Sequence, residues 1–235
     1  MRKGKAETKL LFKVNSNDEL QFFLELVQKI LKNKDSIVET KLNSINIKLY
    51  GKRDEVELLS TQLKNAHGLV KSAFLLNRDG ISKIDITLLS WITGYHVDKE
   101  FFSTMLSELN VGKLDQGRII STTLSLKDLI QKYKEVHLTF TSVLPQEHKD
   151  IRKVITILLI LFPRSTVEDL VRFGIENHLL ERKNGKLIFR ADKSRIIHTF
   201  KQEYVDSPKK TTVSELKKDD KLNILDGGKI IFKQI

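Results

Sequence analysis

Two hydrophobic periodicities alternate along residues 1–80. The strict alternation of apolar and polar residues in INIKLY, residues 45–50, predicts a strand with one buried face. Apolar residues spaced three and four apart predict two amphipathic helices, one ending near Lys32 and one over residues 53–70. Two further strands are expected at residues 9–14 and 37–42. This order predicts a β-α-β-β-α two-layer sandwich with both helices on one face of the sheet.

Two known architectures share this order of elements. A ferredoxin-like fold adds one more strand after the second helix. The strand, glycine and helix at residues 45–59 resemble the last strand and helix of K-homology RNA-binding domains. Those domains clamp RNA with a G-x-x-G loop, and this sequence contains no such loop. The resemblance therefore implies a ferredoxin-like or K-homology-like fold for residues 1–80 but no RNA-clamping function.

Residues 81–144 are predicted to be helical with a short strand. Helices are expected up to Gly94 and over residues 98–109, then a strand at residues 118–122 and a helix capped by Ser125. Two helices followed by a strand fit a helix-turn-helix motif with a wing. The pattern leaves open whether this segment is a separate domain.

Residues 145–205 resemble the end of a winged-helix domain. A helix over residues 146–162 ends at a proline, and a second helix leads into the stretch NGKLIFR, residues 184–190. Its Asn-Gly pair predicts a type I′ turn between two strands. The order helix, helix, hairpin is that of a recognition helix followed by a wing.

A similar stretch, GGKIIFK, lies within residues 206–235, which we expect to form a linker and a C-terminal hairpin. Acidic residues stand close to this second stretch, so we interpret it as a structural hairpin.

The chain as a whole is predicted to be an α+β protein. Its N-terminal sandwich is followed by helical segments with winged-helix-like hairpins.

Composition excludes several classes of protein. The chain of 235 residues has no Cys, which excludes disulfides and thiolate metal ligands and fits a reducing cytoplasm. The longest apolar run, residues 154–162, is too short for a membrane span, which needs about 20 residues. We therefore expect a cytoplasmic protein without membrane contact. Abundant Lys, Ile and Leu with scarce Met resemble the composition of thermophile proteins.

No sequence motif indicates catalysis. The chain lacks the glycine motifs that bind phosphates or dinucleotides, and it lacks the nucleophile elbow of hydrolases. Its six His residues never stand four apart or in an H-x-E arrangement, which argues against zinc. Neighbouring acidic residues stand at predicted helix starts, where they favour the helix dipole. We expect a non-enzymatic protein without a cofactor or metal.

The net charge of +11 points to an anionic partner. Positive charge lies toward both ends of the chain, around a neutral middle. Lys52 and Arg53 stand at a predicted helix start, where free backbone N–H groups favour phosphate. A denser group of candidate nucleic-acid-binding cations surrounds the first hairpin: Arg182, Lys183, Lys186, Arg190, Lys193 and Arg195. The alternative is that these cations only solvate an edge strand and prevent aggregation.

The charges of the helix before the first hairpin are evidence against sequence-specific DNA recognition. A helix in the major groove normally brings Arg, Asn or Gln to base edges. The polar positions of this helix are more acidic than basic: Glu168, Asp169, Arg172, Glu176 and Asn177. Recognition of nucleic-acid shape or backbone is therefore favoured over base readout.

Three hydrophobic stretches together resemble a family of small archaeal proteins known only as a domain of unknown function. They are IDITLLSWITGYHVDKEFF at residues 84–102, GRIISTTLSLKDLI at residues 117–130 and STVEDLVRFGIENHLL at residues 165–180. The resemblance covers most of residues 9–200 and implies an archaeal, cytoplasmic setting. It supplies no substrate and no functional residue.

Our leading hypothesis is a non-enzymatic nucleic-acid-binding protein. Structured RNA or a ribonucleoprotein is favoured as partner over a DNA operator, although DNA stays open. Binding would use the first hairpin and the Lys52-Arg53 turn. The alternative is a protein-interaction or assembly factor, or a homo-oligomer, whose positive charge is incidental. Candidate interface aromatics for that alternative are Trp91, Tyr95 and Phe102.

Overall fold

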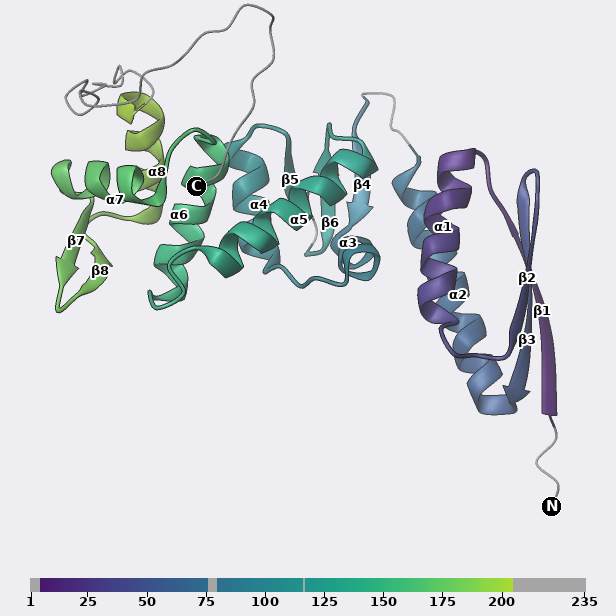
Figure 1. Ribbon diagram of the computed structural model, residues 1–235. Coiled ribbons are helices and arrows are strands. Elements are labelled where there is room, and N and C mark those ends of the chain that lie inside the picture. The colour runs from purple at the N-terminus through teal and green to yellow at the C-terminus, as the bar shows by residue number, and fades with distance from the viewer. Residues whose placement is uncertain (1–4, 76–79, 116, 205–235) are drawn as a thin grey trace, which may run out of the picture.

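The computed structural model describes residues 5–75, 80–115 and 117–204. Figure 1 shows an elongated arrangement, with the N-terminal sandwich at one end and the hairpin of β7 (Leu180–Lys183) and β8 (Lys186–Phe189) at the other. The chain is an α+β protein, as expected from its sequence. The C-terminal hairpin expected within residues 206–235 lies outside the described residues.

The N-terminal module forms the expected two-layer sandwich. It comprises β1 (Lys5–Lys13), α1 (Asn17–Ile30), β2 (Ser36–Lys41), β3 (Ser44–Lys52) and α2 (Arg53–Ala73). The strands form an antiparallel sheet in the order β1-β3-β2. Both helices lie on one face of this sheet (Figure 1). Ile45, Ile47 and Leu49 of β3 are fully buried, which confirms the alternation seen in INIKLY.

Among the described residues, the N-terminal sheet does not gain a fourth strand. β4 (Ser82–Asp85), the next strand after α2, pairs antiparallel with β6 (Ile119–Thr122) in a second sheet. The ferredoxin-like alternative is therefore wrong for the described residues. β4 pairs with β6 and not with β1 or β2, so the first sheet keeps three strands within the described residues.

The second sheet contains two strands that the hydrophobic pattern did not predict. Its order is β4-β6-β5, with β5 at Gly112–Asp115. β4 and β5 have four residues each, too few for a two-residue period to stand out. The helices of this segment are α3 (Ile86–Thr93), α4 (Lys99–Glu108) and α5 (Leu126–Ser142). The two helices α3 and α4 and the later strand β6 were expected from the sequence, whereas β4 before α3 and β5 before β6 were not.

The third segment also shows the expected order of helix, helix and hairpin. Its helices are α6 (Lys149–Leu161), α7 (Val167–Glu176) and α8 (Lys193–Thr199), followed by a π-helical turn at Phe200–Tyr204. Thr166 and Asp169 form a capping box at the start of α7. The sequence pattern did not predict α8 or the π-helical turn. Phe200 is fully buried, so this end of the described chain belongs to the core.

Two polar contacts connect segments that are distant in sequence. The Lys29 ammonium of α1 donates to the backbone carbonyls of Trp91, at 3.2 Å, and Ile92. These carbonyls lie near the C-terminal end of α3, where the helix dipole favours a cation. The Asp98 carboxylate caps α4 by accepting the Phe101 N–H at 2.9 Å, and it pairs with Lys153 of α6 at 3.2 Å. The Phe101 N–H and Lys153 lower the pKa of Asp98 below its usual value.

Replacing two helical glycines by Ala should change the free energy of unfolding in opposite directions, because only one of them is closely packed. A Cβ on Gly174 would lie 2.7 Å from Cδ1 of the buried Leu180, so Gly174→Ala should destabilise the fold by about 1–2 kcal/mol. Gly68 in α2 is exposed with no atom near its missing Cβ. Gly68→Ala should therefore stabilise by roughly 0.5–1 kcal/mol. Urea unfolding of both variants measures these effects, and stabilisation by Gly174→Ala would contradict the packing.

Replacing Asp98 tests the contact between α4 and α6. The pKa of Asp98 is lowered by folding, so its stabilising effect is present above the unfolded pKa of about 3.9 and is lost as pH falls through the folded pKa. Asn is also a good N-cap residue, so Asp98→Asn should keep the cap and lose the ion pair. The variant should be less stable than wild type near neutral pH, and the difference should shrink in acid.

The matched control for this experiment is Asp18→Asn. Asp18 is an exposed carboxylate in the first turn of α1 that makes no ion pair within the described residues. Urea unfolding at several pH values gives the free energy of unfolding of each protein. A difference between wild type and Asp98→Asn that stays constant from neutral to acid pH would exclude the ion pair as its cause.

Candidate nucleic-acid interface

The β7-β8 hairpin is formed by its turn and by alternating side chains. Asn184 and Gly185 both have positive φ angles, 52° and 79°, as a type I′ turn requires. Lys183 and Lys186 face each other across the turn, and Leu180 faces Phe189. One face of the return strand carries Leu187 and Phe189 and the other carries Lys186, as expected from the sequence.

Buried contacts hold the hairpin against the helices. Leu187 is almost fully buried, and its backbone N–H donates to the Glu147 carboxylate at 3.0 Å. Glu147 is itself buried, in the turn before α6. The Arg190 N–H donates to the Leu179 carbonyl at 2.9 Å. The Glu147 carboxylate, forty residues away in sequence, holds β8 in place at Leu187, the residue next to Lys186.

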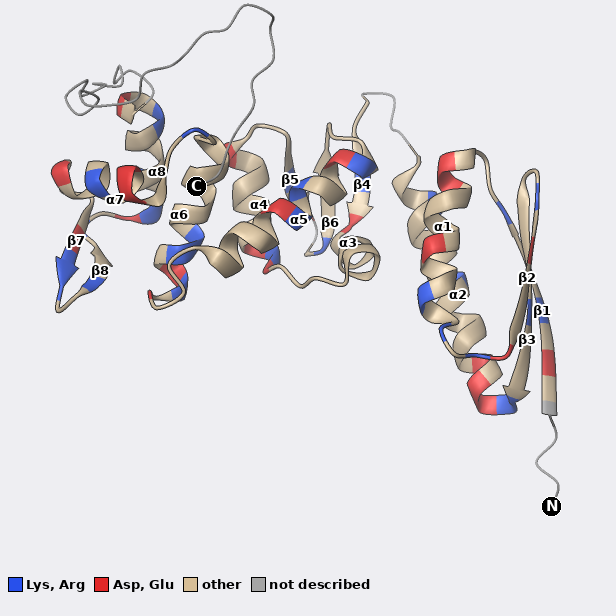
Figure 2. Cartoon of the chain, viewed as in Figure 1, with Lys and Arg blue, Asp and Glu red and all other residues tan. Residues whose placement is uncertain are grey.

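Three cations lie at the end of the hairpin, and we call them the hairpin tip: Arg182, Lys183 and Lys186. All three side chains are exposed. The Arg182 guanidinium donates to the Gly185 carbonyl of the turn at 3.3 Å. Within the described part of the chain, none of the three forms an ion pair with a carboxylate. Their charges are therefore free for an external anion (Figure 2).

The other predicted cations of this region are arranged differently. Arg190 forms an ion pair with Glu181 on the neighbouring strand. Lys193, at the start of α8, pairs with Asp150 of α6 at 3.0 Å, and this contact lowers the pKa of Asp150. Arg195 is exposed on α8. The cluster of six in the sequence thus divides into a free tip, two paired cations and one cation on a helix.

Lys52 and Arg53 lie far from the hairpin tip, at the start of α2 in the N-terminal module (Figures 1 and 2). Arg53 pairs with Glu57 at 3.0 Å, and this carboxylate raises the pKa of the guanidinium. Lys52 is exposed at the N-cap position and makes no side-chain cap bond. The structure therefore does not bring the two groups of predicted residues into one site.

Helix α7 presents an acidic surface to solvent. Its exposed charged side chains are Glu168, Arg172 and Glu176. Two carboxylates and one guanidinium are poorly suited to contact DNA in the major groove.

The aromatic residues expected at a protein interface differ in exposure. Phe102 is fully buried, and the Tyr95 ring stacks on the His137 ring with 4.3 Å between the ring centroids. Trp91 stays partly exposed.

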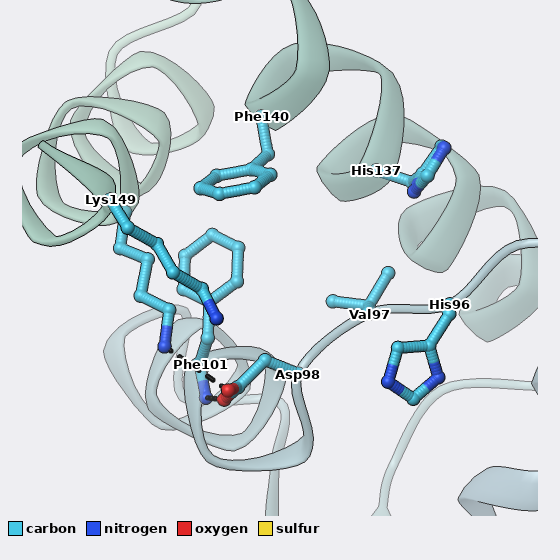
Figure 3. Close-up of a pocket in the computed structure, with 8 residues that line it drawn as sticks. His96, Val97, Asp98, Phe101, His137, Phe140 and Lys149 are labelled. Carbon is cyan, nitrogen blue, oxygen red and sulfur yellow. Dashed lines mark hydrogen bonds and ion pairs between the residues drawn. The ribbon is translucent and has the colours of Figure 1, made fainter. Parts of the chain in front are cut away.

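A small cavity lies among α4, α5, α6 and the loop before α4 (Figure 3). Its volume is about 160 Å³, and its wall includes His96, Asp98, His137, Lys149 and Lys153. Phe101 and Phe140 form its apolar side. Asp98 is already engaged by Lys153 and the cap of α4. The sequence did not reveal this cavity because its wall comes from three segments whose residues form no local motif.

The described residues hold no group of three or more His, Asp or Glu side chains placed to bind a metal ion. Nor do they contain a helix long and apolar enough to cross a membrane.

Comparison with known protein families gives a match over most of the chain. Residues 12–197 match the family described as an uncharacterized protein conserved in archaea (DUF2067). No curated protein and no solved structure matches the chain. The match covers most of the chain, from the end of β1 to the middle of α8. The chain therefore belongs to this archaeal family, as the three hydrophobic stretches indicated.

Proposed function

We propose that the protein is a non-enzymatic RNA-binding protein of the cytoplasm and that its hairpin tip contacts the RNA backbone. The observation that carries this proposal is the state of Arg182, Lys183 and Lys186. These cations are exposed and lack carboxylate partners among the described residues. They stand on a hairpin whose strand β8 is held by a buried hydrogen bond at Leu187, next to Lys186.

A fixed cation binds phosphate at a smaller entropic cost than a cation on a mobile loop, because less freedom is lost on binding. Each phosphate contact also releases condensed counterions, which favours association at low salt. The net charge of +11 adds long-range attraction. Phosphate contact through the hairpin tip therefore agrees with both local geometry and overall charge.

Structured RNA is the favoured partner over a DNA operator. The helix in the position of a recognition helix, α7, exposes Glu168 and Glu176 toward solvent, and such carboxylates repel phosphate. A basic hairpin needs no base-reading helix to follow a folded RNA, since double-stranded RNA is recognised mostly by shape and backbone. Association with a ribonucleoprotein would use the same contacts between the hairpin-tip cations and RNA phosphates.

Substitution of the hairpin tip tests this proposal. The variant Arg182→Ala, Lys183→Ala, Lys186→Ala should bind a structured RNA more weakly than wild type at low salt. The slope of log Kd against log salt concentration should become shallower by about 2–3, since each lost phosphate contact removes about 0.7–0.9. Fluorescence anisotropy with a labelled RNA stem-loop and with duplex DNA, over a salt series, measures both quantities.

A matched control removes the same charge elsewhere. Lys64, Lys99 and Lys127 are exposed on α2, α4 and α5, so their replacement by Ala changes net charge equally without touching the hairpin. This control should keep nearly the wild-type slope. Equal losses in both triple variants would show that only net charge matters, and no binding of wild type to any nucleic acid at low salt would reject the proposal.

A further inference from the structure

Among the described residues, no helix lies on one face of the N-terminal sheet (Figure 1). The register pairs Leu10 with Ile47 and Phe12 with Ile45, and these side chains are buried beneath α1 and α2. Because side chains alternate along a strand, the residues between them point to the opposite side. We call this opposite side of β1, β2 and β3 the open sheet face.

The register places residues of the open sheet face in rows that cross all three strands. One row is Lys9, Lys48 and Ile37, and another is Lys13, Ser44 and Lys41. Seven residues of β1, from 7 to 13, give the face a length of about 20 Å, and three strands give a width of about 10 Å. These dimensions suit an extended chain of a few nucleotides.

Cations dominate the charge of this face. Its described Lys residues outnumber its two carboxylates, Glu7 and Glu39. Glu7 pairs with Lys9 at 3.6 Å, and Glu39 pairs with Lys48 at 3.3 Å. Within the described residues, Lys13 and Lys41 at one end of the face form no ion pair. A surplus of positive charge is therefore left at that end.

Apolar groups lie between the cations. Leu11 is 65% exposed and Ile37 is 46% exposed, although both belong to strands of a folded sheet. Tyr50 of the central strand belongs to the same face and is half-buried. Leu11 lies between Lys9 and Lys13 on β1. Tyr50 lies opposite Glu7, two residues from Lys48, at the end of the face away from Lys13 and Lys41. A surface that alternates such apolar groups with lysines can stack unpaired bases while cations hold the phosphates.

We propose that the open sheet face binds single-stranded RNA. Tyr50 provides a ring for stacking of one base, Leu11 and Ile37 contact neighbouring bases, and Lys9, Lys13 and Lys41 hold the backbone. A protein partner would have to bury these lysines with only Glu7 and Glu39 nearby, whereas a phosphate backbone supplies the missing negative charge. This site adds single-strand binding to the proposed RNA-binding function and uses none of the hairpin-tip residues.

The test uses the full-length protein and two labelled RNAs, a short oligouridine and a stem-loop. The variant Lys9→Ala, Lys13→Ala, Lys41→Ala should bind oligouridine more weakly, with a salt slope shallower by about 2, from about 0.7 for each phosphate contact. Tyr50→Leu keeps an apolar side chain but removes the ring, and it should weaken oligouridine binding about five-fold or more. Thermal unfolding followed by circular dichroism confirms that each variant is folded.

The hairpin-tip triple variant makes the two sites distinguishable. It should leave oligouridine binding near the wild-type value and weaken stem-loop binding, whereas the sheet variants should do the reverse. Unchanged oligouridine binding in folded Tyr50→Leu and in the triple variant of Lys9, Lys13 and Lys41 would overturn RNA binding by the open sheet face. The proposal for the hairpin tip would then still stand. Loss of oligouridine binding in the sheet variants would support it even if the hairpin tip proves inactive. Failure of wild type to bind oligouridine at low salt would overturn it as well.

Discussion

Burial of one face of β3 is the constraint on which the N-terminal module depends. Ile45, Ile47 and Leu49 fill the space beneath α1 and α2, and a shift of one residue in register would expose all three. The same constraint turns Asn46, Lys48 and Tyr50 away from the helices. Within the described residues the two helices cover only one side of the sheet, so packing does not constrain the residues on the other side.

A second constraint acts at the opposite end of the molecule. The buried carboxylate of Glu147 needs a hydrogen-bond donor, since an unpaired buried charge is costly. The N–H of Leu187 supplies this donor and ties β8 to the turn before α6. The hairpin then extends outward with its cations at the end (Figure 2). The two cationic surfaces thus rest on separate parts of the core, so one can be altered without the other.

The sequence predicted what depends on local pattern. Alternation in INIKLY located the buried face of β3, and Asn184-Gly185 located the hairpin turn. The sequence could not show which cations of the cluster form ion pairs, because Lys193 pairs with Asp150, which is distant in sequence. The open sheet face was missed for a similar reason: only the register of β1 and β2 on β3 brings Lys13 and Lys41 to one end.

We propose that RNA contacts this protein at two surfaces, the hairpin tip and the open sheet face. Ultraviolet crosslinking of the full-length protein to total RNA, followed by mass spectrometry of the crosslinked peptides, tests it most directly. We expect crosslinks in peptides that contain Tyr50 and in peptides that span Arg182 to Lys186. Crosslinks confined to other surfaces, such as the wall of the cavity near His137, or an absence of crosslinks at low salt, would contradict it.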